Sequence, residues 1–314
     1  MPLSPMTRRW RKNGLYCLSK LRKILFIVNP IAGTRSKKDI FQLIHAVAAE
    51  GVFDVEICQT RAQGDATRLA RESDADVVVA VGGDGTVHEV AQGMLGSRKS
   101  LGILPCGSGD GLALHLGISR NPKYALQVIQ EGRSEPMDCG TINGQQAFFC
   151  TAGVGLDADV AWEFANAGRR GLWSYISLAW KIWRHYKAQE YVVEIDQEKL
   201  SVKAVLITVG NANQWGNQAR ITSLASVQDG LLDVCIVSPF KTIEIPVLAT
   251  KLLSGRIHTS RRVQMSRGKE ITIHRKQEGP AHFDGDPFMM GKDIHFTARQ
   301  AALQVMVPAR HRPI

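Results

Sequence analysis

The sequence predicts an α/β half followed by a mostly antiparallel β half. In residues 23–137, buried-strand runs alternate with amphipathic helical segments, the order typical of a doubly wound parallel sheet. After residue 136, short strand patterns follow one another and only two helical segments interrupt them. With 44% hydrophobic and 22% charged residues, the 314-residue chain is neither disordered, collagen-like nor a small disulfide scaffold, and it can form two domains.

The strands and helices of the first half come in strict alternation. Ser36 can cap the first helix, in which Ile40, Ile44 and Val47 share one face. Residues 76–81 are continuously apolar, as expected for a parallel strand covered on both faces. We expect strands at 24–28, 53–57, 76–81 and 101–104, helices beginning at 36 and spanning 65–71 and 86–95, and two short helices within 109–131.

The second half begins with a hairpin that turns at Asn143 and Gly144. Further strands are expected at 190–196, 201–209, 231–237, 269–275, 293–297 and 302–307, with helices near 158–166 and 171–187. We place a basic, disordered arm at 1–22, the α/β domain at 23–137 and the β domain at 138–309.

The net charge of +10 is concentrated in three stretches, at 8–23, 168–187 and 256–276. Such patches suggest an anionic partner, either nucleic acid, nucleotide or membrane. Residues 1–22 lack the apolar core of a secretory signal, and no apolar run approaches the ~20 residues of a membrane span. Six widely spaced cysteines fit reduced thiols. We therefore expect a cytoplasmic protein that acts on membranes only from their inner surface.

The segment Gly82-Gly83-Asp84-Gly85-Thr86 follows a strand and opens a helix. Glycines allow close backbone approach to a phosphate, and helix-start amides attract anions. Thr86 with Glu89 forms a predicted capping box. Asp84 could then bind magnesium or take a proton from an attacking hydroxyl, although a tight turn with a capping aspartate is the plainer alternative.

Two further glycine loops follow strands, at 29–33 and 105–111. Because ligands of open parallel sheets bind at the carboxyl ends of strands, the three loops predict one composite nucleotide site. No Walker A sequence is present, which excludes a P-loop protein. Near the C-terminus, Asp284 and Asp286 flank Gly285; they could share a metal or supply a general base, although a surface turn is the alternative.

The motifs NPIAG, GGDGT and PCGSGDGLA, in this order, resemble the diacylglycerol kinase catalytic domain family, especially its sphingosine kinase-like branch. Residues 152–157, 229–233 and 284–286 resemble later motifs of the family, so the resemblance covers about 23–308. It implies an α/β nucleotide domain and a β-sandwich domain, with ATP and magnesium in the cleft between them.

The same resemblance implies roles for single residues. Asp286 resembles the proton acceptor, where the family usually has Glu, with Asp84 and Asp284 as further catalytic acids. Asp229, with backbone oxygens near Ser226 and Leu231, resembles a structural magnesium site. The implied ATP-binding residues are Asn29, Pro30, Gly33, Thr60, Gly82, Gly83, Asp84, Gly85, Thr86, Glu89, Gly107, Ser108 and Gly109.

Three other residues or segments bear on the site. Asp110 stands where the family commonly has Asn, and we expect its added negative charge to need magnesium close by. His88 is expected to be a solvated or packing residue rather than a catalyst. The apolar stripe of 172–183, which includes Trp173, Trp180 and Trp183, predicts a helix packed on its own core, with an interfacial membrane helix as the alternative.

These expectations together predict an ATP- and magnesium-dependent lipid kinase, acting on a hydroxyl of a sphingoid base, diacylglycerol or a related lipid. One alternative is a kinase of a soluble acceptor, since NAD kinases have GGDG-type loops, but their downstream Asn-Glu pair is absent here. Another is a catalytically weak lipid- or nucleotide-binding module. A homodimer is compatible with the sequence, and no nucleic-acid motif is recognisable, so we expect no nucleic-acid partner.

Overall fold

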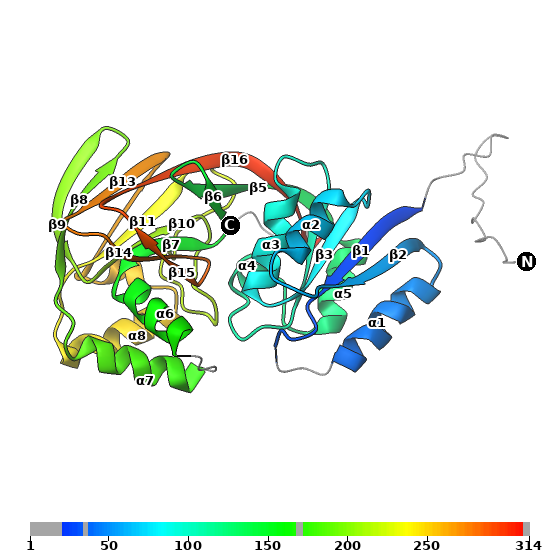
Figure 1. Ribbon diagram of the computed structural model, residues 1–314, viewed down its shortest axis with the longest axis horizontal. Coiled ribbons are helices and arrows are strands. Elements are labelled where there is room, and N and C mark those ends of the chain that lie inside the picture. Colours follow the sequence, from blue (N-terminus) through cyan, green and yellow to red (C-terminus); the bar gives the residue numbers. More distant parts are fainter. Residues whose placement is uncertain (1–20, 34–36, 168–171, 310–314) are drawn as a thin grey trace, which may run out of the picture.

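The computed structural model describes residues 21–33, 37–167 and 172–309. Its first domain contains four parallel strands in the order β2-β1-β3-β4 (Figure 1). Every residue of β3 is buried, in agreement with its continuous apolar sequence. The strand bounds are Arg22–Val28 for β1, Phe53–Gln59 for β2, Val77–Gly82 for β3 and Ser100–Pro105 for β4.

In the described residues of this domain, α1, α2 and α3 join successive parallel strands, α4 and α5 follow the last one, and together these helices cover both faces of the sheet. Helix α1 packs against α5 on one face, and α2 packs against α3 on the other. The predicted doubly wound domain is therefore confirmed. The helices are α1 (Lys37–Ala49), α2 (Asp65–Glu72), α3 (Asp84–Met94), α4 (Gly111–His115) and α5 (Pro122–Glu131).

One long strand, β16 (Asp293–Val307), carries the sheet of the first domain into the second. It pairs in parallel with β4 through Gln304 and Val305, and antiparallel with β5 (Arg133–Ile142) along most of its length. Both domains therefore share a ten-stranded sheet. Its other strands are β6 (Gln146–Phe148), β8 (Gln189–Ile195), β9 (Glu198–Ala204) and β13 (Glu270–Arg275).

A second, six-stranded antiparallel sheet packs on the far part of this sheet and completes a β-sandwich. Side chains from both sheets, such as Phe148, Val154, Ile207 and Phe296, fill the core between them. The sandwich expected from the family resemblance is confirmed. The strands of this sheet are β7 (Thr151–Gly155), β10 (Leu206–Gly210), β11 (Leu232–Val237), β12 (Val263–Gly268), β14 (Gly279–Phe283) and β15 (Asp286–Met290).

The described part of the second domain also contains three helices and two 3₁₀ turns, and α6, α7 and α8 lie together at one end of the domain (Figure 1). None of the helices in the described ranges has the length and apolar character needed to cross a bilayer. The bounds are α6 (Leu156–Asn166), α7 (Leu172–Trp183), η1 (Thr242–Glu244), α8 (Ile245–Leu253) and η2 (Ile257–Thr259).

Two strand predictions in the second domain need correction. The pattern at 201–209 belongs to β9 and β10, which lie in different sheets. The patterns at 293–297 and 302–307 are two parts of β16, joined across an irregularity between Arg299 and Leu303. There Ala301 has φ +48° and donates its backbone N–H to Asp138 Oδ1 at 2.7 Å. Such a bulge breaks the alternation, so one strand resembles two in the sequence.

The predicted packing of the α7 stripe onto the core is wrong. Trp173 is 83% exposed and Trp180 is 49% exposed, although both belong to the stripe. The proposed Ser36 cap and most of the basic arm lie outside the described residues, while Arg22, the last residue of that arm, begins β1. Strand β5 runs through the proposed boundary between residues 137 and 138, which stays a prediction.

Candidate active site

The loops after β1, β2 and β3 open onto a cavity of about 860 Å³ at the carboxyl ends of the parallel strands. On its other side lie Gln146, Phe283 and Asp286 of the second domain, so the cavity occupies the cleft between the domains. Its lining includes these predicted site residues: Asn29, Pro30, Thr60, Gly83, Gly85, Thr86, Glu89 and Asp286.

The first loop is fixed to its neighbours by Asn29 and Gly33. Asn29 Nδ2 donates a hydrogen bond to Thr86 Oγ1 at 3.2 Å, while Asn29 Oδ1 accepts the N–H of Ile31 at 3.1 Å. Gly33 has φ +74°, and a Cβ there would lie 1.7 Å from the carbonyl oxygen of Cys106 in the third loop. Only glycine fits this contact. Gly33 does not line the cavity itself, but it lets the first loop pack against the third.

Thr86 and Glu89 do not form the predicted capping box. Helix α3 begins earlier, at Asp84, so Thr86 lies within its first turn. Glu89 Oε2 instead accepts the backbone N–H groups of Gly64 and Ala66, at 3.0 and 3.2 Å. Glu89 therefore holds the start of α2 beside the cavity rather than the start of α3.

The second and third loops meet at two glycines. A Cβ on Gly107 would lie 2.7 Å from Gly83 Cα, closer than any real side chain allows. Gly82, Gly107, Ser108 and Gly109 are not among the described residues that line the cavity. The close approach of Gly107 to Gly83 lets the second and third loops meet next to the cavity.

The carboxylate of Asp84 is directed at the third loop. Its two oxygens accept the backbone N–H groups of Asp110 and Gly111, at 2.8 and 2.7 Å. Burial is the main reason that the pKa of Asp84 is raised to about 6, and the nearby charge of Asp110 raises it further. Asp84 thus ties α3 to the beginning of α4.

Asp110, the residue that departs from the family pattern, is balanced by protein groups. Its side chain accepts the N–H of Gly107 at 2.8 Å and pairs with Arg120 Nε at 3.0 Å. Arg120 also donates to the carbonyl oxygens of Ser108 and Gly109, at 2.7 and 2.8 Å. An arginine therefore supplies positive charge that we expected from magnesium.

Asp284 is the best-connected acid of the site. Its Oδ1 accepts the N–H groups of Cys150 and Thr151, and its Oδ2 accepts that of Phe149 at 2.9 Å. Oδ2 also lies 2.8 Å from Nδ1 of His88, which belongs to α3 of the first domain. Asp284 therefore anchors the β14–β15 turn and links the domains across the cleft.

His88 is enclosed on both sides by aromatic rings, as the packing interpretation of the sequence predicts. Its ring lies 5.4 Å from that of Phe149 and 5.2 Å from that of Phe283. Burial disfavours its protonation, but the hydrogen bond to Asp284 and the charges of Asp284 and Asp286 outweigh burial and raise its pKa. His88 can therefore carry a positive charge beside the cleft.

Asp286 differs from the other two acids because it reaches the cavity. It is the first residue of β15, and the structure describes no hydrogen bond to its carboxylate from the described residues. Although Asp286 is exposed, desolvation by the protein around it raises its pKa; the charge of His88 opposes this and that of Asp284 adds to it. Asp286 thus lines the cavity and has a pKa above the ordinary value of an aspartate.

The predicted magnesium group around Asp229 has an arginine beside it. Asp229 Oδ1 accepts the N–H of Leu231 at 3.1 Å, and Oδ2 lies 3.6 Å from Arg267 Nη1. Ser226 Oγ accepts the N–H of Gln228 at 3.3 Å. Since Arg267 already supplies positive charge at this carboxylate, the residues fit a cation poorly.

Several residues of the site escaped the sequence analysis. Arg61 lines the cavity directly after Thr60, and its place at the end of a strand was the available signal. Arg120 follows the third glycine loop within ten residues, but neither it nor Gln146 belongs to a motif that would mark it in the sequence.

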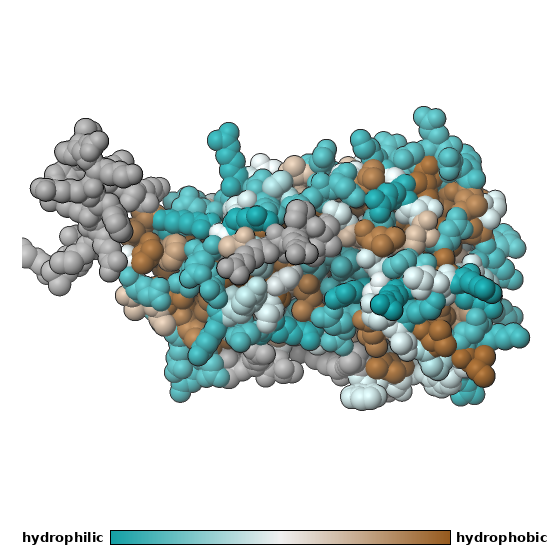
Figure 2. Space-filling model, turned by 180° about the vertical axis from the view of Figure 1, so that it is seen from behind, coloured by the Kyte–Doolittle hydropathy of each residue, from teal (hydrophilic) through white to brown (hydrophobic). Residues whose placement is uncertain are grey.

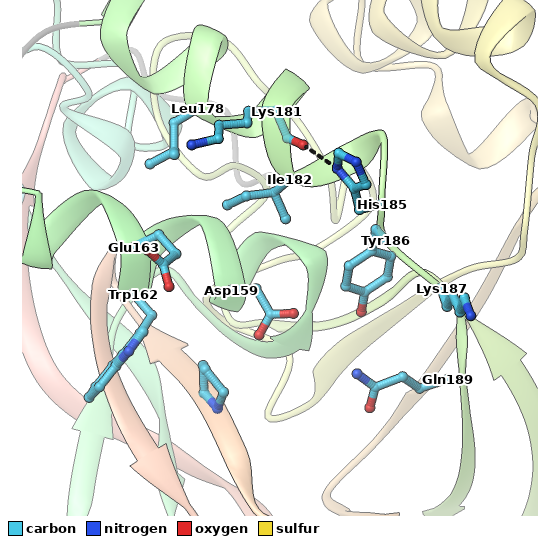
Figure 3. Close-up of a pocket in the computed structure, with 11 residues that line it drawn as sticks. Asp159, Trp162, Glu163, Leu178, Lys181, Ile182, His185, Tyr186, Lys187 and Gln189 are labelled. Atoms are coloured by element: carbon cyan, nitrogen blue, oxygen red, sulfur yellow. Dashed lines mark hydrogen bonds between the residues drawn. The ribbon is translucent and has the colours of Figure 1, made fainter.

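A second cavity of about 720 Å³ lies between α6, α7 and the beginning of β8 (Figure 3). Leu178 and Ile182 line it from α7, while Asp159 and Tyr186 point into it from other segments. Burial, with the neighbouring charge of Asp157, raises the pKa of Asp159 to about 6. The second domain therefore has a hollow lined by apolar, acidic and basic side chains.

Comparisons with known proteins agree with this architecture. Residues 23–142 match the diacylglycerol kinase catalytic domain, and residues 150–307 match the YegS C-terminal NAD kinase beta sandwich-like domain. A crystal structure of a diacylglycerol kinase from Bacillus anthracis superposes with a TM-score of 0.72 at 23% identity, covering 94% of this chain and 98% of that one.

Two curated relatives extend the similarity over nearly the whole chain. The diacylglycerol kinase of Mycobacterium tuberculosis strain H37Rv is 30% identical over 308 residues, which are 93% of this chain and 97% of the relative. That of Bacillus subtilis is 25% identical over 275 residues, 85% of this chain and 90% of the relative. The chain therefore belongs to the bacterial diacylglycerol kinase and YegS-like lipid kinase family, and it is a lipid kinase that uses ATP.

Proposed function

We propose that the enzyme transfers the γ-phosphoryl group of ATP, with magnesium, to a hydroxyl of a membrane lipid that is a sphingoid base, diacylglycerol or a related lipid. The observation that carries the proposal is the cavity between the domains, which brings the glycine loops after β1 and β3 and the loop after β2 together with the carboxylate of Asp286. Since ATP is supplied from the cytoplasm, we further propose that the enzyme works at the inner membrane surface.

In this proposal Asp286 is the proton acceptor. Among the three candidate acids, Asp286 is the one that lines the cavity. The carboxylate oxygens of Asp84 and Asp284 instead accept hydrogen bonds from backbone N–H groups. Its raised pKa suits it to take a proton from an alcohol as the new bond forms. Asp84 and Asp284 then act as positioning residues for the third loop and for the β14–β15 turn.

The proposed reaction is a single in-line displacement. The lipid hydroxyl oxygen forms a bond to the γ-phosphorus, the bond from that phosphorus to the β,γ-bridging oxygen breaks, and ADP leaves. The hydroxyl proton passes to the carboxylate of Asp286. The backbone amides of the glycine loops and of the start of α3 hold the phosphates, while Asn29 and Thr86 fix the loop that faces them.

The cavity fits magnesium only in partnership with the nucleotide. Glu89 and Asp286 offer hard oxygen donors on its wall, which suit this ion. The described residues contain no group of three or more acidic, histidine or cysteine side chains able to hold a metal by themselves. Magnesium characteristically completes such a set with phosphates and water, and it would neutralise charge on the transferred group.

Asp286 can be tested with three substitutions. Asp286→Asn should lower kcat by at least about a hundredfold, since it removes the general base. Asp286→Glu, the residue usual in the family, should retain most activity. Asp54→Asn makes the same chemical change on an exposed residue of β2 and serves as the control. Full kcat in Asp286→Asn would overturn the assignment of the base.

The acceptor can be identified with labelled ATP. Mixed liposomes containing a sphingoid base, ceramide, diacylglycerol, monoacylglycerol and undecaprenol are incubated with the enzyme, and the products are separated by mass. A phosphorylated lipid supports the proposal. Tight binding of ATP and magnesium with no lipid product would favour the binding-module alternative, and a product only from soluble alcohols would favour a soluble acceptor.

A further inference from the structure

Helix α7 is apolar on two sides, and three large apolar side chains on one of these sides are exposed. Leu178 and Ile182 face the cavity between α6 and α7. On another face, Trp173, Ile176 and Trp180 recur at helical spacing and are all exposed. Large apolar side chains on a helix are normally covered by a neighbouring element. The exposure of these three shows that no element in the described part of the chain covers them.

The segment around α8 extends this apolar surface. Trp183 of α7 stacks on Phe240 with ring centroids 4.5 Å apart, and its Nε1 donates to Thr242 Oγ1 at 3.3 Å. This contact joins the end of α7 to η1, where Ile243 is 84% exposed. Val247 and Leu253 continue the exposed apolar side chains along α8. We call Trp173, Ile176, Trp180, Ile243, Val247 and Leu253 the outer apolar face.

The space-filling view agrees with such a surface. Seen from behind, apolar side chains gather along the lower edge of the second domain, at the end where α7 and α8 lie in Figure 1 (Figure 2). On the inner side of α8, Leu248 and Leu252 pack onto a small buried cluster. The exposed Val247 and Leu253 of α8 thus flank an inner side that is packed on the protein.

Positive charge surrounds the outer apolar face. Lys181, Arg184 and Lys187 follow α7 or lie at its end, and Arg256 follows α8; all four are exposed. No ion pair in the described ranges involves any of them. The one acid of the adjoining segment, Glu244, is neutralised by Arg262 at 2.8 Å. The face therefore combines exposed tryptophans with unneutralised cations.

We propose that the outer apolar face docks on the surface of an anionic lipid bilayer. Tryptophan and isoleucine side chains would enter the headgroup boundary, where amphipathic aromatic rings are favoured. The basic side chains around them would meet lipid phosphates. A second copy of the chain suits the face less well, because a two-fold interface would bring like charges together.

Docking in this way would also bring the bilayer to the second cavity. Lys181 and Lys187 belong both to the basic surroundings of the face and to the lining of the cavity under α7. A lipid leaving the bilayer beside α7 would therefore meet this cavity first. This step rests on the proposed lipid substrate, whereas docking itself does not require turnover.

The proposal is tested by flotation of the full chain with vesicles of phosphatidylcholine alone or with 30% phosphatidylglycerol. Binding should require the anionic lipid and weaken as salt is raised from about 0.05 to 0.5 M. Trp173→Ala combined with Trp180→Ala should reduce partition at least tenfold. Lys181→Gln and Arg184→Gln should each reduce it about fivefold.

Matched controls lie on the first domain. Val52→Ala truncates a side chain that is 49% exposed, as Trp180 is, and Lys123→Gln removes an exposed charge; neither should change partition. Vesicles of brominated lipid should quench the tryptophan fluorescence of the native chain, and Trp173→Phe with Trp180→Phe should remove most of that quenching.

Three results would overturn the docking proposal: partition indifferent to anionic lipid, partition unchanged in the double alanine variant, or a dimer in sedimentation velocity that this variant dissociates. Because flotation needs no ATP or acceptor, its outcome is independent of the kinase reaction. Activity on a monomeric short-chain lipid should be unchanged in the double alanine variant, because neither Trp173 nor Trp180 lines either cavity. A native chain that binds vesicles but phosphorylates no lipid would count against the proposed kinase substrate and leave the docking proposal standing.

Discussion

Replacing Arg120 with alanine measures how much the ion pair with Arg120 stabilises Asp110 in the third loop. The substitution removes the 3.0 Å bond to Asp110 and two hydrogen bonds to backbone carbonyls. Breaking a fully buried pair from one side costs about 3–5 kcal/mol. The Arg120 side chain is 36% exposed, so water can replace part of the loss, and we expect about 2 kcal/mol. The melting temperature should fall by about 4 °C.

The measurement is a double-mutant cycle by urea unfolding. Asp110→Asn installs the neutral residue common in the family, so Arg120→Ala should cost about 1 kcal/mol less in that background. Arg71→Ala, at an exposed position on α2, is the control. If Arg120→Ala destabilises both backgrounds equally, Arg120 does not act by balancing Asp110, and our account of this departure from the family pattern is refuted.

Three further predictions concern neighbouring residues of the site. Gly33→Ala should weaken ATP binding and destabilise the protein by clearly more than about 1 kcal/mol, the cost of placing alanine in the left-handed conformation. Gly51→Ala, at φ +66° with open space around it, should lower the stability measured by calorimetry by only that conformational cost. His88→Gln should lower stability by about 2 kcal/mol below pH 6.5, and the deficit should shrink as pH rises through the raised pKa, followed by urea midpoints. The folded protein holds a proton on Asp84 to about pH 6, so that group's contribution to stability should fall by about 2–3 kcal/mol between pH 4 and 6, and Asp84→Asn should flatten this fall.

The fold was predictable because its determinants are local. The continuous apolar run of β3 and the glycine loops after the strands report burial and backbone conformation within a few residues. The bulge at Ala301 was not predictable in this way, since it depends on Asp138, which is 163 residues away in the sequence.

The candidate site shows the same division. Asp286 and Asn29 were identified from short motifs and do line one cavity. The partnership of His88 with Asp284 joins residues 196 positions apart, and only tertiary structure brings them together. For α7, the periodicity of apolar residues predicts the helix. Because the helix has two apolar sides, the sequence alone does not show which side packs on the protein and which is exposed.

The shared strand β16 limits how the cleft can move. Two domains joined by a flexible linker can swing apart on a hinge, but β16 is hydrogen-bonded to β4 in one domain and to β13 in the other. Opening the cleft widely would have to bend or twist a continuous sheet, and the hydrogen bonds between its strands resist this deformation. Nucleotide exchange should therefore proceed by local movement of the loops that line the cavity, with the two domains remaining in nearly fixed orientation.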